Sequence, residues 1–352
     1  MAGSRSVVRP FLDWEGLDLS ELVRVGIVGL GRLGRRHAEN LAFRVAGAQL
    51  VAAASPIETE RAWAETSLNG VTTYPGLGEL LTHPGLDAAW LVTPTSLHAD
   101  QVVASINAGK HVFCEKPLAL DPNDCDRAVA AAASHPRQVV MVGFMRRFDP
   151  SYAEAKRRVD AGELGTVFAI RCVSEDPVDP DGFFVRFAPT SGGIFLDCCI
   201  HDIDLVRWML DGPEIASAAA AGSRVMYPAL SQCGDVDTAS ANVTFTGGQI
   251  ATFYVSRTSH RGYEASMTIV GDKGTLELGA AIPHLPLTLE SGGRRSSAGQ
   301  LDFFERFGDA FLYEAQAFIK AVRDGGPTPL SLRDAREATR LACAMRDALK
   351  VG

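Results

Sequence analysis

The chain lacks the features that mark several large classes of protein. Its seven cysteines show no Cys-X-X-Cys spacing, their number is odd, and a chain of 352 residues does not need disulfide bonds to stabilise a core. No run of about 18 apolar residues is present, which argues against a membrane span. Acidic residues at positions 13, 15, 18 and 21 follow the basic start, so no signal peptide is recognisable. We therefore expect a cytoplasmic protein.

Charge of one sign is not concentrated anywhere in the sequence. The 34 basic and 42 acidic residues give a net charge of -8, and no block of consecutive Lys or Arg occurs. The electrostatic footprint of a nucleic-acid-binding protein is therefore missing, and a small molecule is the favoured partner. Hydrophobic residues make up 46% of the chain, and its length favours about two domains.

The pattern of short apolar runs changes near residue 144. Between Val23 and Gly143, β-branched runs alternate with helical patterns, which predicts an α/β domain with a parallel sheet. After Phe144, alternating segments separated by Gly-rich turns predict an α+β domain with an open, largely antiparallel sheet. We expect four parts, which are an extension at 1–22, a first domain at 23–143, a second domain at 144–330 and a C-terminal helix at 331–352.

A glycine-rich turn follows the first predicted strand. In Gly29-Leu30-Gly31-Arg32-Leu33-Gly34 the glycines stand between a buried strand and a helix, which is the context that a dinucleotide-binding turn requires. Gly31 would let the backbone approach a pyrophosphate, and the N-terminus of the helix would face the anion. A glycine-rich turn without a ligand is the alternative interpretation.

The end of the second predicted strand bears on which dinucleotide would bind. Ser55 stands where NAD-dependent enzymes usually have an Asp or Glu that bonds the ribose 2′-hydroxyl. Without that carboxylate a 2′-phosphate meets less repulsion, and Arg32 or Arg61 could pair with it. We expect NAD or NADP, with NADP modestly favoured, and note that Glu58 and Glu60 argue for NAD.

Three polar residues have the chemistry needed to oxidise an alcohol. Lys116 follows a predicted strand at the sheet edge where α/β proteins bind ligands, and Pro117 stiffens the backbone behind it. Asp197 and His201 stand four residues apart, so in a helix the carboxylate could orient the imidazole and raise its basicity. An exposed loop lysine and a helix salt bridge are the structural alternatives. No metal site is expected, because the adjacent cysteines of this segment point to different sides of a helix.

Taken together, these motifs resemble the Gfo/Idh/MocA oxidoreductase family, and most of all its inositol 2-dehydrogenase branch. The matching segments are Gly29–Gly34, Thr93–His98, Glu115–Pro117, Gly143–Asp149 and Gly192–His201. The resemblance implies an N-terminal Rossmann domain that binds NAD or NADP and a C-terminal domain with a substrate cleft between the two. It also implies a homodimer or homotetramer built through the flat face of the C-terminal sheet.

The resemblance assigns roles to individual residues. Lys116 would hold the substrate hydroxyl and the nicotinamide side, His201 would accept the hydroxyl proton, and Asp197 would support the substrate and the base. These three are the expected catalytic residues. The expected substrate-binding residues are Lys116, Met145, Arg146, Asp197, His201 and Tyr263. The expected cofactor-binding residues are Gly29, Gly31, Arg32, Leu33, Gly34, Ser55, Thr93, Pro94, His98, Glu115 and Lys116.

The expected activity is reversible oxidation of a secondary hydroxyl on a cyclic polyol or sugar, with hydride transfer to nicotinamide. The alternatives are another pyranose or anhydrosugar dehydrogenase of the same family, an NAD-dependent glycosidase, and a non-catalytic dinucleotide-binding sensor. The presence of Lys116, Asp197 and His201 argues against the sensor. The sequence leaves the substrate, the physiological direction and the number of subunits open.

Overall fold

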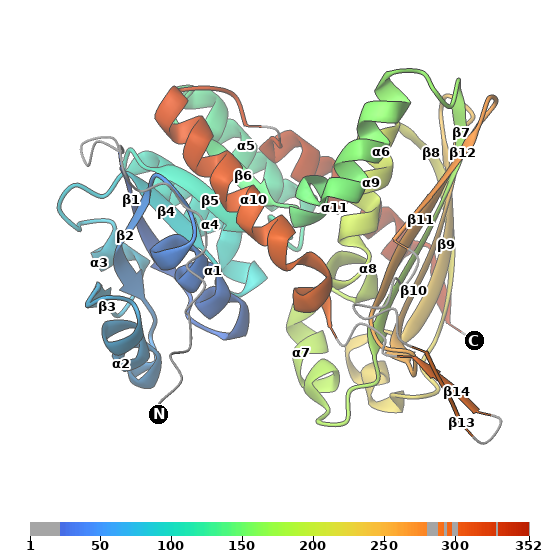
Figure 1. Ribbon diagram of the computed structural model, residues 1–352, viewed down its shortest axis with the longest axis horizontal. Coiled ribbons are helices and arrows are strands. Elements are labelled where there is room, and N and C mark those ends of the chain that lie inside the picture. Colours follow the sequence, from blue (N-terminus) through green and yellow to red (C-terminus); the bar gives the residue numbers. More distant parts are fainter. Residues whose placement is uncertain (1–21, 280–287, 292–293, 298–301, 329, 352) are drawn as a thin grey trace, which may run out of the picture.

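The computed structural model describes residues 22–279, 288–291, 294–297, 302–328 and 330–351 (Figure 1). Apart from Leu22, the expected extension at 1–22 lies outside these residues. Within the described ranges, no helix combines the length and the apolar character that a membrane crossing requires.

The first domain is built on a six-stranded parallel sheet with the strand order β3-β2-β1-β4-β5-β6. Its strands are β1 (Val23–Val28), β2 (Ala48–Ala54), β3 (Thr72–Tyr74), β4 (Ala88–Leu91), β5 (His111–Glu115) and β6 (Val140–Gly143). The connecting helices are α1 (Arg32–Phe43), α2 (Glu58–Ser67), α3 (Leu77–Leu80), α4 (Thr95–Asn107) and α5 (Pro122–Ser134). The order reverses between β1 and β4, and at such a reversal the carboxyl ends of the strands border a ligand-binding crevice.

Side chains of the parallel strands alternate between two hydrophobic cores. Phe113 of β5 packs on one face, where it stacks on Trp90 with ring centroids 3.7 Å apart. Its neighbours Val112 and Cys114 belong to the core on the opposite face, together with side chains of α4 and α5. Both faces of the sheet are therefore covered, which explains the continuous apolar runs in the sequence.

The second domain contains a seven-stranded sheet with the order β12-β11-β7-β10-β9-β8-β15. Its strands are β7 (Val167–Pro177), β8 (Ile215–Ser223), β9 (Thr238–Phe245), β10 (Ile250–Ser259), β11 (Glu264–Gly271), β12 (Thr275–Leu278) and β15 (Leu349–Val351). The pairs β7–β10 and β8–β15 are parallel, and the other neighbours are antiparallel. A separate hairpin is formed by β13 (Thr288–Ser291) and β14 (Arg294–Ser297).

Helices and 3₁₀ turns connect this sheet to the first domain. They are α6 (Pro150–Asp160), α7 (Phe183–Ser191), α8 (Ile194–Asp197) and α9 (Ile200–Met209), with 3₁₀ turns η2 (Met145–Phe148) and η3 (Pro228–Cys233). Figure 1 shows α6, α8 and α9 between the first domain and the sheet, whose other face is turned outward. The expected fold class, a Rossmann domain followed by an α+β domain with an open, largely antiparallel sheet, is confirmed.

The last two helices pack against parts of both domains. Helix α10 (Phe303–Asp324) belongs by sequence to the expected second domain, yet its Phe318 and Ile319 are buried in the Rossmann core. Helix α11 (Leu332–Asp347) packs against α5 and α9, and residues 349–351 form β15 rather than extending the helix. A capping box between Ser331 and Asp334 fixes the start of α11. The boundaries at 22/23, 143/144 and 330/331 stay predictions.

Candidate active site

A cleft of about 830 Å³ lies between the carboxyl edge of the parallel sheet and the helices of the second domain. From the first domain it is lined by the first residues of α1, the ends of β4 and β5, and the start of α4. From the second domain it is lined by η2, the end of β7, and α7, α8 and α9. Most of the expected site residues lie there, namely Arg32, Leu33, Thr93, Pro94, His98, Glu115, Lys116, Met145, Arg146, Asp197, His201 and Tyr263.

The glycine-rich turn has the shape that a dinucleotide requires. Gly29 has φ +93°, and a Cβ on Gly34 would lie only 2.0 Å from the Gly29 carbonyl oxygen, so both positions need glycine. A Cβ on Gly31 would meet no protein atom within 4 Å, which leaves open space beside the backbone. Helix α1 begins next to this space without a side-chain cap, so its first amide groups are available to an anion. The turn therefore fits a pyrophosphate.

Arg32 connects this turn to aromatic side chains of the second domain and of α10. Its guanidinium lies 5.6 Å from the ring centroid of Phe183, 5.5 Å from that of Phe303 and 5.6 Å from that of Phe304. Cation–π contacts at these distances hold a side chain in place while leaving its N–H groups free to bind an anion.

Ser55 lies apart from the main cleft, at the end of β2. Its hydroxyl donates to Glu60 Oε2 at 2.5 Å, and Glu60 lines a second hollow of about 670 Å³ together with Gly31, Arg32, Arg35 and Arg36. A carboxylate is thus present at the end of β2, but it comes from α2. The sequence position alone did not reveal this placement.

Lys116 is held from two sides. Its backbone amide donates to Glu115 Oε2 at 3.0 Å, and the other oxygen of Glu115 contacts His37 Nε2 at 2.8 Å. The Lys116 ammonium donates to the backbone oxygen of Asp197 at 3.0 Å, which joins the end of β5 to the end of α8. Glu115 therefore anchors the Lys116 backbone and is itself held by His37.

Both ring nitrogens of His98 contact backbone oxygens, so the side chain holds the surrounding loops in place. Its Nδ1 lies 2.8 Å from the Pro117 oxygen and its Nε2 lies 2.7 Å from the Thr93 oxygen. The buried ring therefore ties the loop after β5 to the loop after β4. Both loops and His98 itself line the cleft, so the ring helps to hold the wall of the expected cofactor site.

His201, in the first turn of α9, lies in an environment that favours the neutral imidazole. The residue is 6% exposed and its Nδ1 has no hydrogen-bond partner among the described residues. Burial, and then the positive charges of Lys116 and Arg146, lower the pKa of His201 well below its ordinary value of 6.5. The imidazole is therefore neutral near pH 7 and is able to accept a proton.

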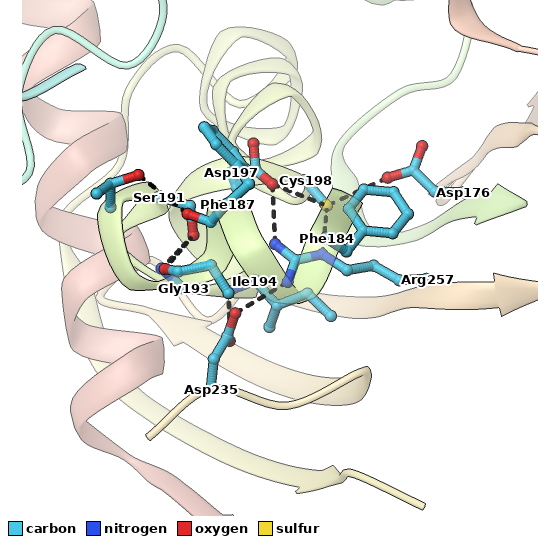
Figure 2. Close-up of polar contacts among 12 residues, drawn as sticks. Asp176, Phe184, Phe187, Ser191, Gly193, Ile194, Asp197, Cys198, Asp235 and Arg257 are labelled. Atoms are coloured by element: carbon cyan, nitrogen blue, oxygen red, sulfur yellow. Dashed lines mark hydrogen bonds and ion pairs between the residues drawn. The ribbon is translucent and has the colours of Figure 1, made fainter. Parts of the chain in front are cut away.

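Asp197 does not contact His201 in the way the four-residue spacing suggested. Asp197 ends α8 and His201 is the second residue of the next helix, α9, so the two do not share a continuous helical face. The Asp197 carboxylate instead accepts from Arg257 Nη2 at 2.8 Å, and Cys198 Sγ lies 3.6 Å from the same oxygen (Figure 2). The expected orientation of the imidazole by Asp197 is therefore wrong for this structure, although both residues line the cleft.

Arg146 and Tyr263 form one buried unit in the wall of the cleft. Arg146 Nη2 donates to Tyr263 Oη at 2.9 Å, and Nη1 donates to Asp202 Oδ1 at 2.6 Å. Burial is the main cause that raises the pKa of Tyr263 to about 12, so its hydroxyl stays protonated. Tyr263 thus lines the cleft together with the other expected substrate residues, including buried Met145.

Several residues of the cleft were missed by the sequence analysis. Asp176 closes β7 and lines the cleft, and its pKa is raised first by burial and then by Asp197. Phe183 and Phe187 of α7 line the wall facing the Rossmann turn. Arg257 was also missed, although it follows inward-facing Ala251, Phe253 and Val255 in the period-two pattern of β10. An arginine at a core-facing strand position was the available signal.

Comparisons with known proteins agree with this geometry. A family model described as "Oxidoreductase family, NAD-binding Rossmann fold" matches residues 23–144, and the GFO/IDH/MocA C-terminal domain matches residues 152–277. The chain is 38% identical over 310 residues to scyllo-inositol 2-dehydrogenase (NAD(+)) of Bacillus subtilis, with 88% of each protein covered. It is 33% identical over 329 residues to myo-inositol 2-dehydrogenase of Thermotoga maritima, covering 93% of this chain and 96% of that protein.

A solved structure shows the same arrangement of both domains. The crystal structure of scyllo-inositol dehydrogenase from Lactobacillus casei, with bound NAD(H) and scyllo-inositol, matches with a TM-score of 0.89 and 35% identity. The match covers 93% of this chain and 97% of that one. Fold and cleft together define an oxidoreductase with a dinucleotide-binding Rossmann domain. Within that class, the chain belongs to the Gfo/Idh/MocA family.

Proposed function

We propose that this oxidoreductase removes a hydride from a secondary hydroxyl of inositol or a closely related cyclic polyol, with NAD as the acceptor. The observation that carries the proposal is the placement of Lys116 and the neutral His201 imidazole in one cleft with Arg32 and Leu33 of the glycine-rich segment. The names of the relatives described above, which act on scyllo-inositol and myo-inositol, support the choice of a cyclic polyol.

The residues of the cleft divide the work of alcohol oxidation. Bound NAD supplies the nicotinamide carbon that accepts the hydride, and the Gly29–Gly34 turn with Thr93 and Pro94 would hold it. His201 takes the hydroxyl proton, because a neutral buried imidazole is a competent general base. Lys116 stabilises the negative charge that develops on the alcohol oxygen. Asp197 and the Arg146–Tyr263 unit offer polar groups to the remaining hydroxyls of the ring.

NAD is the coenzyme that the hollow at the end of β2 favours. The Glu60 carboxylate bonds the Ser55 hydroxyl and lines that hollow, where it would accept from a ribose 2′-hydroxyl and repel a 2′-phosphate. Arg32, Arg35 and Arg36 line the same hollow and would favour the phosphate. Because the Glu60 carboxylate stands at the end of β2 and bonds Ser55, we propose NAD as the coenzyme, in place of the modest NADP preference expected from Ser55 alone.

The outward face of the second sheet supports assembly into a homodimer or homotetramer. Phe168 of β7 and Ile250 and Tyr254 of β10 are large apolar or aromatic side chains that are exposed on strands of this sheet. An open apolar face of this kind is typical of a subunit interface. A cytoplasmic location is also part of the proposal, and the absence of disulfide bonds among the seven cysteines supports it.

A polyol panel tests the proposed function directly. The near-ultraviolet absorbance of reduced nicotinamide is followed with scyllo-inositol, myo-inositol, glucose and an anhydrosugar, each with NAD and with NADP. We expect the highest kcat/KM with an inositol and NAD. Binding of NAD without turnover of any panel member would instead support a dinucleotide-binding sensor, and turnover of sugars alone would overturn the assignment to a cyclic polyol.

A further inference from the structure

Arg257 is a fully buried arginine behind the cleft, close to the end of β10. It is 0% exposed, and its guanidinium makes contacts on both sides of the fork (Figure 2). Nη2 donates to Asp197 Oδ2 at 2.8 Å, Nη1 donates to Asp235 Oδ2 at 2.9 Å, and Nε donates to Cys198 Sγ at 3.4 Å. A buried cation shared by two carboxylates in this geometry is fixed in place.

These contacts hold both ends of α8. Asp235 uses its other oxygen, Oδ1, to accept from the backbone amide of Ile194 at 2.9 Å, and Ile194 is the first residue of α8. Asp197 is the last residue of the same helix. Because α8 has only four residues, Arg257 and Asp235 together determine where the whole turn lies relative to β10.

The turn carries a group that contacts the proposed reaction centre. The backbone oxygen of Asp197 accepts from the Lys116 ammonium at 3.0 Å. Arg257 and Cys198 contact Oδ2 of Asp197, while no hydrogen bond to its Oδ1 occurs among the described residues. Asp197 lines the cleft, so one end of this carboxylate is held from behind and the other is available to a substrate hydroxyl.

We infer that Arg257 is a positioning residue for the proposed polyol oxidation. It holds the Asp197 carboxylate toward the substrate and, through the Asp197 carbonyl, fixes the Lys116 ammonium beside the reacting hydroxyl. Lysine cannot replace it, because an ammonium is a point charge that does not reproduce the two-sided fork. The inference rests on the proposed function only for its kinetic readout.

A double-mutant cycle tests whether Arg257 acts through Asp197. The variants are Arg257→Lys, Asp197→Asn and the double variant, and the measurements are kcat, KM and the Kd of NAD. A displacement of about 1 Å at a reacting group costs about 10² in rate, so we expect R257K to lower kcat/KM by about that factor while the Kd of NAD stays within about twofold. The double variant should be no worse than the poorer single variant.

Arg147→Lys is the matched control for loss of a buried ion pair. Arg147 is buried and donates from Nε to Asp204 Oδ2 at 2.7 Å, and it does not line the cleft. We expect R147K to lower the melting temperature as R257K does, to keep kcat/KM within about twofold, and to combine additively with D197N. Additive effects of R257K and D197N, or wild-type kcat/KM in R257K, would overturn the inference.

A second readout does not depend on turnover. The rate of reductive methylation of Lys116 is followed by peptide mass spectrometry, with Lys110 of the same domain as an internal reference. We expect Lys116 to react several-fold faster in R257K and in D197N than in the wild type. In the double variant it should react no faster than in the faster single variant, and in R147K it should react at the wild-type rate. An unchanged rate in R257K would overturn the inference. Absence of polyol turnover in the wild type would defeat the proposed function and leave this labelling result to decide the role of Arg257.

Discussion

Replacement of Lys116 by methionine is the most direct test of the cleft chemistry. Methionine keeps much of the side-chain volume and removes the ammonium that lies 3.0 Å from the Asp197 carbonyl oxygen. A positioned donor that stabilises a developing oxyanion contributes about 10²–10³ in kcat, or about 3 to 4 kcal/mol. We expect K116M to lose a factor in this range. The lost hydrogen bond should lower the free energy of unfolding by only about 1 kcal/mol, so the protein stays folded.

The same substitution should change the pH dependence of the remaining activity. A general base acts in its deprotonated form, so kcat/KM falls as pH falls through the pKa of His201. Burial is the main cause that lowers this pKa, and the positive charge of Lys116 is the second. Without Lys116 the pKa rises toward 6.5, and the acid limb of the profile moves to higher pH. The pKa of His201 should remain below 6.5, because the burial of His201 is unchanged.

Steady-state turnover of the best polyol, followed through reduced nicotinamide, gives kcat and KM for K116M across a pH series. A fluorescence titration gives the Kd of NAD. Lys110→Met is the matched control, because Lys110 lies in the same domain and donates to the Leu86 carbonyl oxygen at 2.8 Å, outside the cleft. If K116M turns over within about threefold of the wild type, or if its loss is matched by weaker NAD binding, Lys116 has no role in the chemical step.

Four further predictions concern the cofactor site, the assembly and the stability. Gly31→Ala should raise the Kd of NAD without lowering the melting temperature, since its Cβ meets no protein atom within 4 Å. Gly34→Ala should lower the melting temperature, since its Cβ would lie 2.0 Å from a carbonyl oxygen. A lower melting temperature for Gly31→Ala than for Gly34→Ala would contradict the fit of the turn. Glu60→Gln should raise kcat/KM with NADP relative to NAD by about tenfold, equivalent to about 1.4 kcal/mol, and an unchanged ratio would remove Glu60 from coenzyme selection. Tyr254→Glu should shift the mass measured by light scattering toward the monomer, while an unaltered mass would place the interface elsewhere. The buried Glu314 carboxylate has no hydrogen-bond partner among the described residues, and burial, followed by the charge of Glu115, raises its pKa well above the ordinary 4.5. Its contribution to stability is therefore lost as pH rises above 4.5. In thermal scans, Glu314→Gln should raise the melting temperature more at pH 8 than at pH 5.

The Rossmann part of the fold could be predicted from sequence because its signals are local. Each buried strand of the first domain is a short apolar run followed by a helical pattern, and the glycine-rich turn follows β1 directly. The strand β3 has no such signal, since Thr72–Tyr74 is three residues long, lies at the sheet edge and is not fully buried. The placement of α10 in the Rossmann core could not be predicted, because its apolar face is equally suited to either domain.

Sequence predicted that several residues of the candidate site lie together, but not all of the residues that line the cleft and not their contacts. Lys116, Asp197 and His201 do line one cleft, as their motifs indicated. Their spacing suggested an Asp–His pair, but the helix is interrupted between them, and the partner of Asp197 is Arg257, sixty residues away in the chain. Such long-range ion pairs depend on how the second sheet packs behind α8, and no local pattern encodes that packing.

The position of α10 has a consequence for how the molecule unfolds. Phe307 and Phe311 near the start of this helix belong to the core that continues into the second domain, while Phe318 and Ile319 belong to the core on the other face of the Rossmann sheet. Detaching either domain would therefore expose part of the same helix, so the two should melt in one cooperative transition. Dinucleotide binding at the distant turn would then protect backbone amides in the second sheet from hydrogen exchange.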